Sequence, residues 1–319
     1  MAIEEKNAQG GIHGRKIELL IRDDENSPEV AGKRVHELAA LGVEAIIGPN
    51  VSSIAGGMLP AIVETSIVTI SPTVSSLFFV GKDDPFFRMN SSTRQNAGAY
   101  AANHYAKGGR RVSAAFGIQN RLFTESWLKE FQTAFEALGG AVVATAPYDA
   151  KGADGYAAVV APLLAVNPDA ILLVSNGVDT AQIAQQFRKA GSNIKLIAAE
   201  WAASEQLIEL GGKAVEGVTI LQTYDRDSVV PAYTQFRDTY IGQFTNRPGY
   251  SSIASYDAAM VLFAALERSY AEKGLSLKEA IFAVVPVKGL QQDLTFDRFG
   301  DGARKKFFVT VKNGTFVGE

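Results

Sequence analysis

The feature that most constrains the fold is an apolar run that stops abruptly at a polar turn, and it occurs twice in close succession. Residues 43–47 are halted by a Gly-Pro-Asn turn and lead into a helix predicted to about residue 65, with Ser52 or Ser53 as its N-cap. Residues 67–71 are halted by a Pro-Thr turn. Short, mostly apolar runs of this kind predict buried strands of a parallel sheet whose faces are covered by helices.

Hydroxyl groups gather at both turns. Ser52 follows the first run, and Thr73 and Ser75 follow the second. The carboxyl ends of parallel strands lie at one edge of a sheet, where open α/β folds bind their ligands. The first amides of a helix lack partners and the helix dipole is positive there, so this edge suits a small anion such as a carboxylate. The serines could instead only cap the helix, but the recurrence of the arrangement favours a binding site.

The rest of the chain predicts a second α/β series and then a helical block. An early strand is expected at residues 16–22, before the first turn. In the second series, strands are expected at residues 111–116, 141–146, 169–174, 194–198 and 217–221, with helices between them. After residue 224 helices dominate, and short strands are expected at residues 294–296 and 306–311. We expect the helical block to pack back on the first sheet, so that the chain crosses between domains more than once.

The composition fits two globular domains and excludes several classes of protein. The chain has 319 residues, of which 47% are hydrophobic and 20% charged, enough apolar material for two cores. A net charge of −3 gives no electrostatic reason to expect nucleic acid or an anionic membrane as a partner. No apolar run is long enough to span a bilayer. Because the chain has no cysteine, disulfides and thiolate chemistry are excluded.

Residues suited to catalysis or metal binding are not grouped in the sequence. His13, His36 and His104 stand apart, without the cysteine or carboxylate spacing of a metal site. A serine nucleophile at position 52 or 75 would need a nearby base, and no histidine is a candidate. No nucleotide-binding glycine motif follows a strand. We therefore expect a binding protein with no metal or cofactor, rather than an enzyme.

One acidic residue stands out. Glu200 directly follows the apolar run at residues 194–198, again at the carboxyl end of a predicted strand. It could be a solvated loop residue, or an acid that interacts with a helix dipole. It could also be the counter-charge for a ligand ammonium, where a charge-assisted hydrogen bond contributes roughly 1.5–3 kcal/mol once water is excluded.

Several short motifs occur in a characteristic order along the chain. They are NAQGGIHGR at residues 7–15, an Asp pair at 23–24, IGP at 47–49, ISP at 70–72, FDRFGD at 296–301 and VTVKNGTFV at 309–317. Their order and spacing resemble the leucine/isoleucine/valine-binding type of periplasmic solute receptor, the type I binding proteins of ABC importers. The resemblance covers essentially the whole chain.

The resemblance implies an α/β protein of two doubly wound, Rossmann-like lobes, joined by three crossover strands and closing on a ligand like a hinge. The N-terminal lobe would comprise residues 1–92 and 225–302, and the C-terminal lobe residues 93–224 and 303–319. Crossovers are expected near residues 90–94, 222–225 and 302–304.

The resemblance also implies which residues line the site. Turn hydroxyls and amides of the first lobe would hold an amino-acid carboxylate, and Glu200 of the second lobe would hold the ammonium. Phe123 falls where the family often has a tyrosine, so we expect an apolar contact in place of a hydrogen bond. The residues assigned to the ligand site are Asn50, Ser52, Thr73, Val74, Ser75, Phe123, Asn176, Glu200 and Tyr256.

The N-terminal end departs from the family pattern. Family members open with a strand and a Gly-rich turn before the helix that ends in the NAQGG motif, whereas this chain begins within that helix. We expect the first lobe to lack a central strand, to be weakened, and to leave a more open cleft on that side. No signal peptide is visible in this chain, and a periplasmic or extracellular location is implied by the resemblance alone.

The predicted function is a non-enzymatic, extracytoplasmic receptor that delivers a small amino acid, branched-chain or related, to the permease of an ABC importer. One alternative with the same fold binds aromatic or aliphatic carboxylates or amides, with Glu200 hydrogen-bonded rather than ion-paired. Another is a ligand-sensing regulator whose closed form contacts a partner protein instead of a permease.

Overall fold

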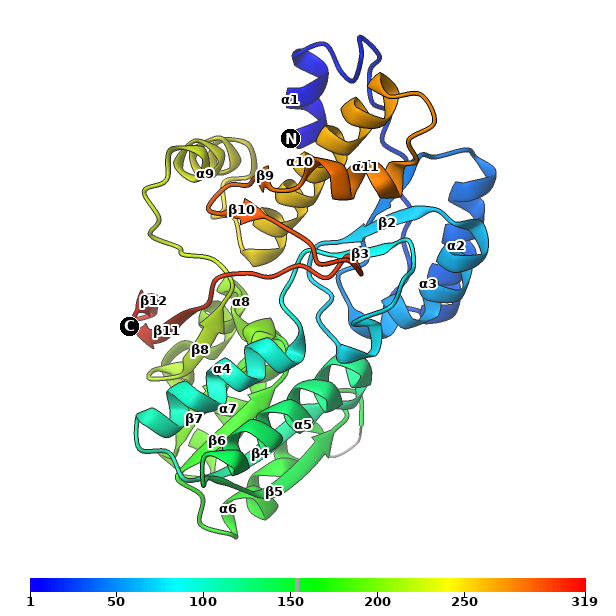
Figure 1. The fold of residues 1–319 in the computed structure, drawn as a ribbon. Helices are drawn as coiled ribbons and strands as arrows, with labels where there is room; N and C mark the ends of the chain where they lie inside the picture. The colour runs from blue at the N-terminus through cyan, green and yellow to red at the C-terminus, as the bar shows by residue number, and fades with distance from the viewer. Residues whose placement is uncertain (153–154) are drawn as a thin grey trace. The chain divides into compact units, whose positions relative to one another are not determined.

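The computed structural model describes residues 1–152 and 155–319, which form two α/β units (Figure 1). The N-terminal unit comprises residues 1–75, 79–91 and 225–304, and the C-terminal unit comprises residues 76–78, 92–224 and 305–319. The α/β fold class predicted from the sequence is confirmed. None of the described helices is both long and apolar enough to cross a membrane.

The C-terminal unit is built on a seven-stranded sheet with the order β12-β11-β8-β7-β6-β4-β5. Its strands are β4 (Arg111–Gly117), β5 (Ala141–Tyr148), β6 (Ala170–Val174), β7 (Lys195–Ala198), β8 (Thr219–Gln222), β11 (Phe307–Lys312) and β12 (Thr315–Gly318). The first five are parallel, and β11 pairs antiparallel with both β8 and β12. The carboxyl ends of β4, β6 and β7 therefore share one edge, from which the candidate site residues of this unit extend.

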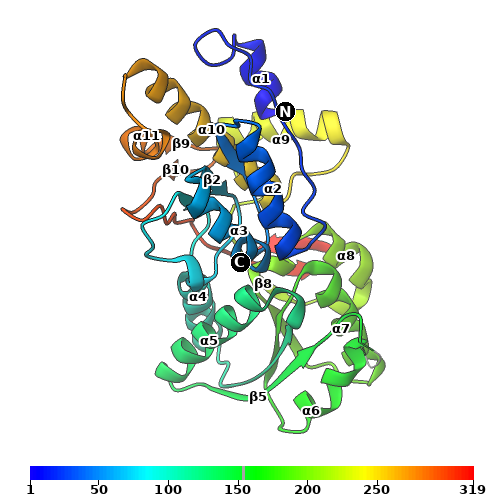
Figure 2. The same cartoon turned by 90° about the vertical axis from the view of Figure 1, so that its right-hand side faces the viewer.

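Helices cover both faces of this sheet (Figure 2). One face carries α4 (Thr93–Ala106) and α5 (Arg121–Ala137), and the other carries α6 (Val160–Leu164), α7 (Gly177–Lys189) and α8 (Glu205–Gly211). Short 3₁₀ turns flank them: η2 (Ile118–Asn120), η3 (Gly155–Val159), η4 (Glu200–Ala202) and η5 (Gly212–Val215). The helix expected between the strands at residues 141–146 and 169–174 is thus a 3₁₀ turn followed by one short α-helix.

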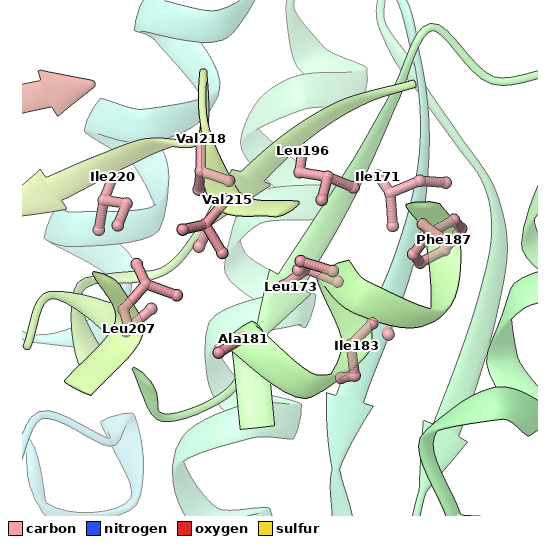
Figure 3. Close-up of a cluster of buried hydrophobic side chains, with 14 of the residues drawn as sticks. Ile171, Leu173, Ala181, Ile183, Phe187, Leu196, Leu207, Val215, Val218 and Ile220 are labelled. Carbon is pink, nitrogen blue, oxygen red and sulfur yellow. The ribbon is translucent and has the colours of Figure 1, made fainter. Parts of the chain in front are cut away.

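The alternation of side chains along β6 explains why an unbroken apolar run is required. Ile171 and Leu173 pack against Ile183 and Phe187 of α7 (Figure 3), whereas Leu172 faces the cluster formed with α4 and α5. All five residues of β6 are buried. Burial of each such side chain contributes about 1.5–3 kcal/mol, so both faces need apolar residues.

The N-terminal unit contains a three-stranded parallel sheet, β1 (Ala45–Ile47), β2 (Val68–Ser71) and β3 (Phe86–Arg88), in that order. Its helices are α1 (Ala2–Ala8), α2 (Pro28–Ala40), α3 (Ser52–Thr65), α9 (Pro231–Phe244), α10 (Tyr250–Ala271) and α11 (Leu277–Val284). A 3₁₀ turn, η1 (Leu77–Phe79), and a two-stranded hairpin, β9 (Val287–Lys288) with β10 (Asp293–Leu294), complete the regular structure. Ile70 of β2 and Phe87 of β3 pack against α10 and α11, so the helical block covers this sheet.

The strand predicted at residues 16–22 does not form, and this prediction is wrong. The segment joins α1 to α2 without a strand assignment (Figures 1 and 2). Leu19 and Ile21 are 60% and 76% exposed. A segment forms a strand only when its backbone hydrogen-bonds to a neighbouring strand. Residues 16–22 have no such neighbour, because β1 pairs with β2 alone. The strand expected at residues 294–296 is also shorter than predicted, because β10 ends at Leu294.

Candidate functional site

In the N-terminal unit the candidate residues other than Tyr256, which lies on α10, are found where β1 and β2 end. The predicted role of Ser52 or Ser53 as N-cap is wrong, because Val51 occupies the N-cap position in an extended conformation and Ser52 is the first helical residue. Val51 has no side-chain acceptor for the amides of the first turn. A helix of this length with an uncapped start keeps its positive end available to an anion.

Hydrogen bonds tie the two turns to each other. The Ser71 hydroxyl donates to the Pro49 carbonyl at 2.7 Å and accepts from the Val74 amide at 3.1 Å. The Thr73 hydroxyl donates to the Asn50 carbonyl at 2.8 Å. Thr73 therefore has a structural role, and it fixes the turn that carries Asn50.

Two of the predicted site hydroxyls make no hydrogen bond within the described chain. Ser52 and Ser75 are 2% and 3% exposed, and neither hydroxyl hydrogen-bonds to another residue in the described part of the chain. Val74 lies between Thr73 and Ser75 with 1% of its side chain exposed. Because a buried hydroxyl without a partner is costly, these two groups are the natural donors for a ligand oxygen.

In the C-terminal unit Glu200 lies in η4, just after β7, and is 6% exposed. One carboxylate oxygen accepts from Asn96 Nδ2 at 2.8 Å and the other accepts from Trp127 Nε1 at 2.7 Å. Burial raises the pKa of Glu200 above its usual value, and the hydrogen bonds from Asn96 and Trp127 oppose that rise. The carboxylate is thus held by neutral donors from α4 and α5, with no salt-bridge partner among the described residues.

An aromatic pair lies beside Glu200. Phe123 of α5 is 5% exposed, and its ring meets the ring of Trp201 edge to face, with centroids 5.5 Å apart. Trp201 is the residue after Glu200. Phe123 therefore lies against another aromatic ring, and the apolar contact that it is expected to make with a ligand stays a prediction.

Asn176 and Tyr256 are already bonded within their own units. The Asn176 side chain caps α7 by accepting from the Asp179 amide at 2.8 Å. The Tyr256 hydroxyl donates to Glu5 of α1 at 2.6 Å, and its ring packs against Phe236. The Tyr256 hydroxyl is thus already engaged, whereas the cap bond of Asn176 uses only its amide oxygen and leaves the amide nitrogen as a donor. Both assignments to the ligand site stay predictions.

Sequence reasoning missed several polar and aromatic residues of this region. Asn96 and Trp127 hold Glu200 but lie in helices far away along the chain, and no local pattern marks them. Asp179 accepts from the hydroxyls of Tyr148, at 2.8 Å, and Tyr156, at 2.7 Å, near the carboxyl ends of β5 and β6. Of these residues only Tyr148 could have been found from the sequence, because it stands at the end of a strand, much as Glu200 directly follows one.

A metal centre has no support in the described structure. No group of three or more His, Asp or Glu side chains is placed to share an ion, in residues 1–152 and 155–319. The candidate recognition groups are hydroxyls and helix amides in the N-terminal unit, and a carboxylate and aromatic rings in the C-terminal unit. Groups of these kinds suit small polar organic ligands.

Residues 1–315 match the family of periplasmic binding proteins. The chain belongs to this family. Its similarity to individual members is low but extends over nearly its full length. The Leu/Ile/Val-binding protein homolog 1 of Brucella suis is 24% identical over 312 residues, which cover 94% of this chain and 80% of the relative. The resemblance inferred from the order of the motifs is confirmed, and the members of the family are binding proteins rather than enzymes.

Solved structures show the same fold. The leucine-binding protein LivK of Thermotoga maritima has a TM-score of 0.91 at 24% identity and covers 100% of this chain and 91% of its own. A solute-binding protein from Rhodopseudomonas palustris, solved with benzoate, has a TM-score of 0.87 at 18% identity and covers 99% of this chain and 90% of its own. These matches support the type I periplasmic binding protein architecture.

Proposed function

We propose that this chain is an extracytoplasmic receptor for a small amino acid, branched-chain or related, and that it delivers the ligand to the permease of an ABC importer. The observation that carries the proposal is the uncapped start of α3 with the unpartnered hydroxyls of Ser52 and Ser75. These groups provide hydrogen-bond donors and a positive helix end, which together suit a carboxylate.

Glu200 would bind the ammonium group. Each of its oxygens accepts one hydrogen bond from within the C-terminal unit and retains capacity for another from a ligand. The bonds from Asn96 and Trp127 would fix the position of the carboxylate before the ligand arrives. The charge of Lys306 already favours the ionised form of Glu200. A ligand cation would lower the cost of the buried carboxylate charge further, which would make binding favourable.

Delivery would follow the mode of periplasmic receptors. The Brucella suis relative is named as a Leu/Ile/Val-binding protein homolog, and the Thermotoga maritima structure as a leucine-binding protein. We propose that the two units close around the amino acid and that the closed form is recognised by the permease. Family membership also supports an extracytoplasmic location.

Isothermal titration calorimetry tests this assignment by comparing how tightly the protein binds leucine and 4-methylpentanoate. The second ligand is leucine without its ammonium group. The wild type should bind leucine more tightly, and Glu200→Gln should remove most of that preference. Ser52→Ala should weaken both ligands by about tenfold, the loss of one hydrogen bond. Glu209→Gln, an exposed acid on α8, is the control and should bind as the wild type does. If Glu200→Gln kept the full preference for leucine, the ammonium assignment would be wrong.

An aromatic carboxylate is the second candidate. The Phe123–Trp201 pair offers a ring-binding surface next to Glu200, and the Rhodopseudomonas palustris protein was solved with benzoate. In this case Glu200 would be protonated, in keeping with its raised pKa, and would donate a hydrogen bond to the ligand. Thermal shifts with benzoate but with no amino acid would favour this candidate, because a ligand at 100 times its Kd adds about 2.7 kcal/mol to stability.

A further inference from the structure

A buried glutamine lies at the carboxyl edge of the sheet in the C-terminal unit. Gln222 is the last residue of β8, and only 1% of it is exposed. Neither its amide nitrogen nor its amide oxygen hydrogen-bonds to any group within residues 1–152 and 155–319. A buried polar atom without a partner bears the full cost of its desolvation, and here both polar atoms of one side chain bear it. This amide is therefore suited to a partner from outside the chain.

The register of the sheet places Gln222 at the level of Glu200. β7 and β8 are parallel neighbours, and Ala198 lies opposite Ile220. Glu200 and Gln222 each follow that pair by two residues. The turn η4, which carries Glu200, also packs against β8. Gln222 thus lies at the same strand ends as the residue proposed to bind the ammonium group.

The two side chains approach this edge from opposite faces of the sheet. Leu221 packs with α4 and α5, and Ile220 packs with α7 and α8 (Figure 3), so Gln222 extends on the face of α7 and α8. Glu200 is held on the other face by hydrogen bonds from α4 and α5. A ligand that binds over the strand ends would meet the carboxylate from one face and the amide from the other. The amide therefore suits a part of the ligand other than its ammonium.

We propose that Gln222 determines the side-chain specificity of the amino-acid site, and that it selects a ligand with a carboxamide side chain, such as asparagine. The inference rests on the function proposed above, which assigns the carboxylate and the ammonium of the ligand but not its side chain. Gln222 presents an N–H donor and a carbonyl acceptor side by side. A second carboxamide would satisfy both, whereas a carboxylate offers no donor, an ammonium offers no acceptor, and a hydrocarbon offers neither.

Asparagine and leucine are a close comparison, because their side chains branch at the same carbon atom and have a similar size. A site that hydrogen-bonds a polar group rejects an analogue without it, since the buried polar groups of the site are then left unpaired. Two hydrogen bonds between neutral groups predict that asparagine binds about 10- to 100-fold more tightly than leucine.

Equilibrium binding of asparagine and of leucine to the full chain, measured by calorimetry, tests the proposal. The wild type should prefer asparagine by that factor. The variant Gln222→Met keeps the volume of the side chain but removes the amide, so it should lose the preference. Gln206→Met, at an exposed glutamine of α8, is the control and should keep it. Leucine binding as tight as that of asparagine in the wild type, or an unchanged preference in Gln222→Met, overturns the proposal.

Urea unfolding without ligand separates recognition from a structural role. An amide that is unpaired until a ligand binds destabilises the free protein, so Gln222→Met should raise the folding equilibrium constant about tenfold. If this variant is less stable than the wild type, or does not fold, the amide serves the fold itself and the proposal is overturned.

The outcome also distinguishes this inference from the function on which it rests. Glu200→Gln should weaken asparagine and leucine alike and leave the preference between them unchanged. Binding of no amino acid by the wild type would refute the amino-acid function, and this assignment with it. Binding of amino acids with a preference for leucine would overturn the role of Gln222 alone.

Discussion

His104 should make the C-terminal unit less stable in acid, and the effect can be isolated by one substitution. The side chain lies on α4, is 3% exposed, and packs against Phe135 with ring centroids 5.7 Å apart. Its Nε2 has no hydrogen-bond partner in the described chain, and Asp169 is 3.8 Å away, too far for a hydrogen bond. Gly109 packs so closely that a Cβ there would lie 2.1 Å from Nε2. This environment favours the neutral imidazole.

The size of this loss of stability follows from the pKa of His104. Burial, with a smaller effect of Lys195, lowers the pKa of His104 from 6.5 to about 4. As the pH falls below about 6.5 the unfolded chain gains a proton that the folded unit does not, so stability is lost progressively down to about pH 4. For a single site with these two values the loss between pH 7.5 and 5.0 is about 2 kcal/mol. The variant His104→Leu removes this contribution.

Urea unfolding followed by tryptophan fluorescence measures the effect, because both tryptophans, Trp127 and Trp201, lie in the C-terminal unit. Between pH 7.5 and 5.0 the wild type should lose about 2 kcal/mol more than His104→Leu does. His36→Leu is the control: this histidine is on α2 of the other unit and its side chain is 50% exposed. A loss of stability on acidification that is equal in the wild type and His104→Leu would refute the reasoning.

Two further predictions concern substitutions in the N-terminal unit, and the second has its comparison substitution, at Gly98, in the C-terminal unit. Asp257 is fully buried and forms an ion pair with Arg304, so Asp257→Asn should destabilise this unit by about 3–5 kcal/mol, measured by thermal denaturation; no change would mean that the pair is not formed. Gly57 of α3 packs on α2, where a Cβ would lie 2.2 Å from the Pro28 carbonyl oxygen, so Gly57→Ala should lower stability by about 1–3 kcal/mol or more. Gly98→Ala on α4 has open space and should instead raise stability by about 0.5–1 kcal/mol, so equal effects of the two substitutions would contradict the packing argument.

Much of the fold could be predicted because its signals are local. The apolar run at residues 169–174 predicted a strand, and β6 spans Ala170–Val174 with every residue buried. An unbroken apolar run bounded by turn residues has few other ways to bury its side chains. The same pattern at residues 16–22 failed, because a strand also needs a neighbour and its pairing is not encoded in the segment itself.

For the candidate site, too, some features could be predicted from local sequence and others could not. Position after a strand was enough to nominate Ser52, Ser75 and Glu200 as candidates, since chain order in a parallel sheet fixes which turns share an edge. Their hydrogen-bond states could not be predicted. Ser52 or Ser53 was expected to cap α3, but Val51 takes the cap position and the Ser52 hydroxyl is unbonded in the described chain.

The sequence by itself determined the α/β class, the family and the turns that carry the candidate recognition groups, because these depend on residue patterns within short segments. Only the tertiary structure decided which groups are free. Trp127 lies 73 residues from Glu200 in the sequence, yet donates a hydrogen bond to its carboxylate, and Tyr256 is held by Glu5, 251 residues away. Such pairs form when helices pack on a finished sheet, so the availability and pKa of a side chain are properties of the folded unit.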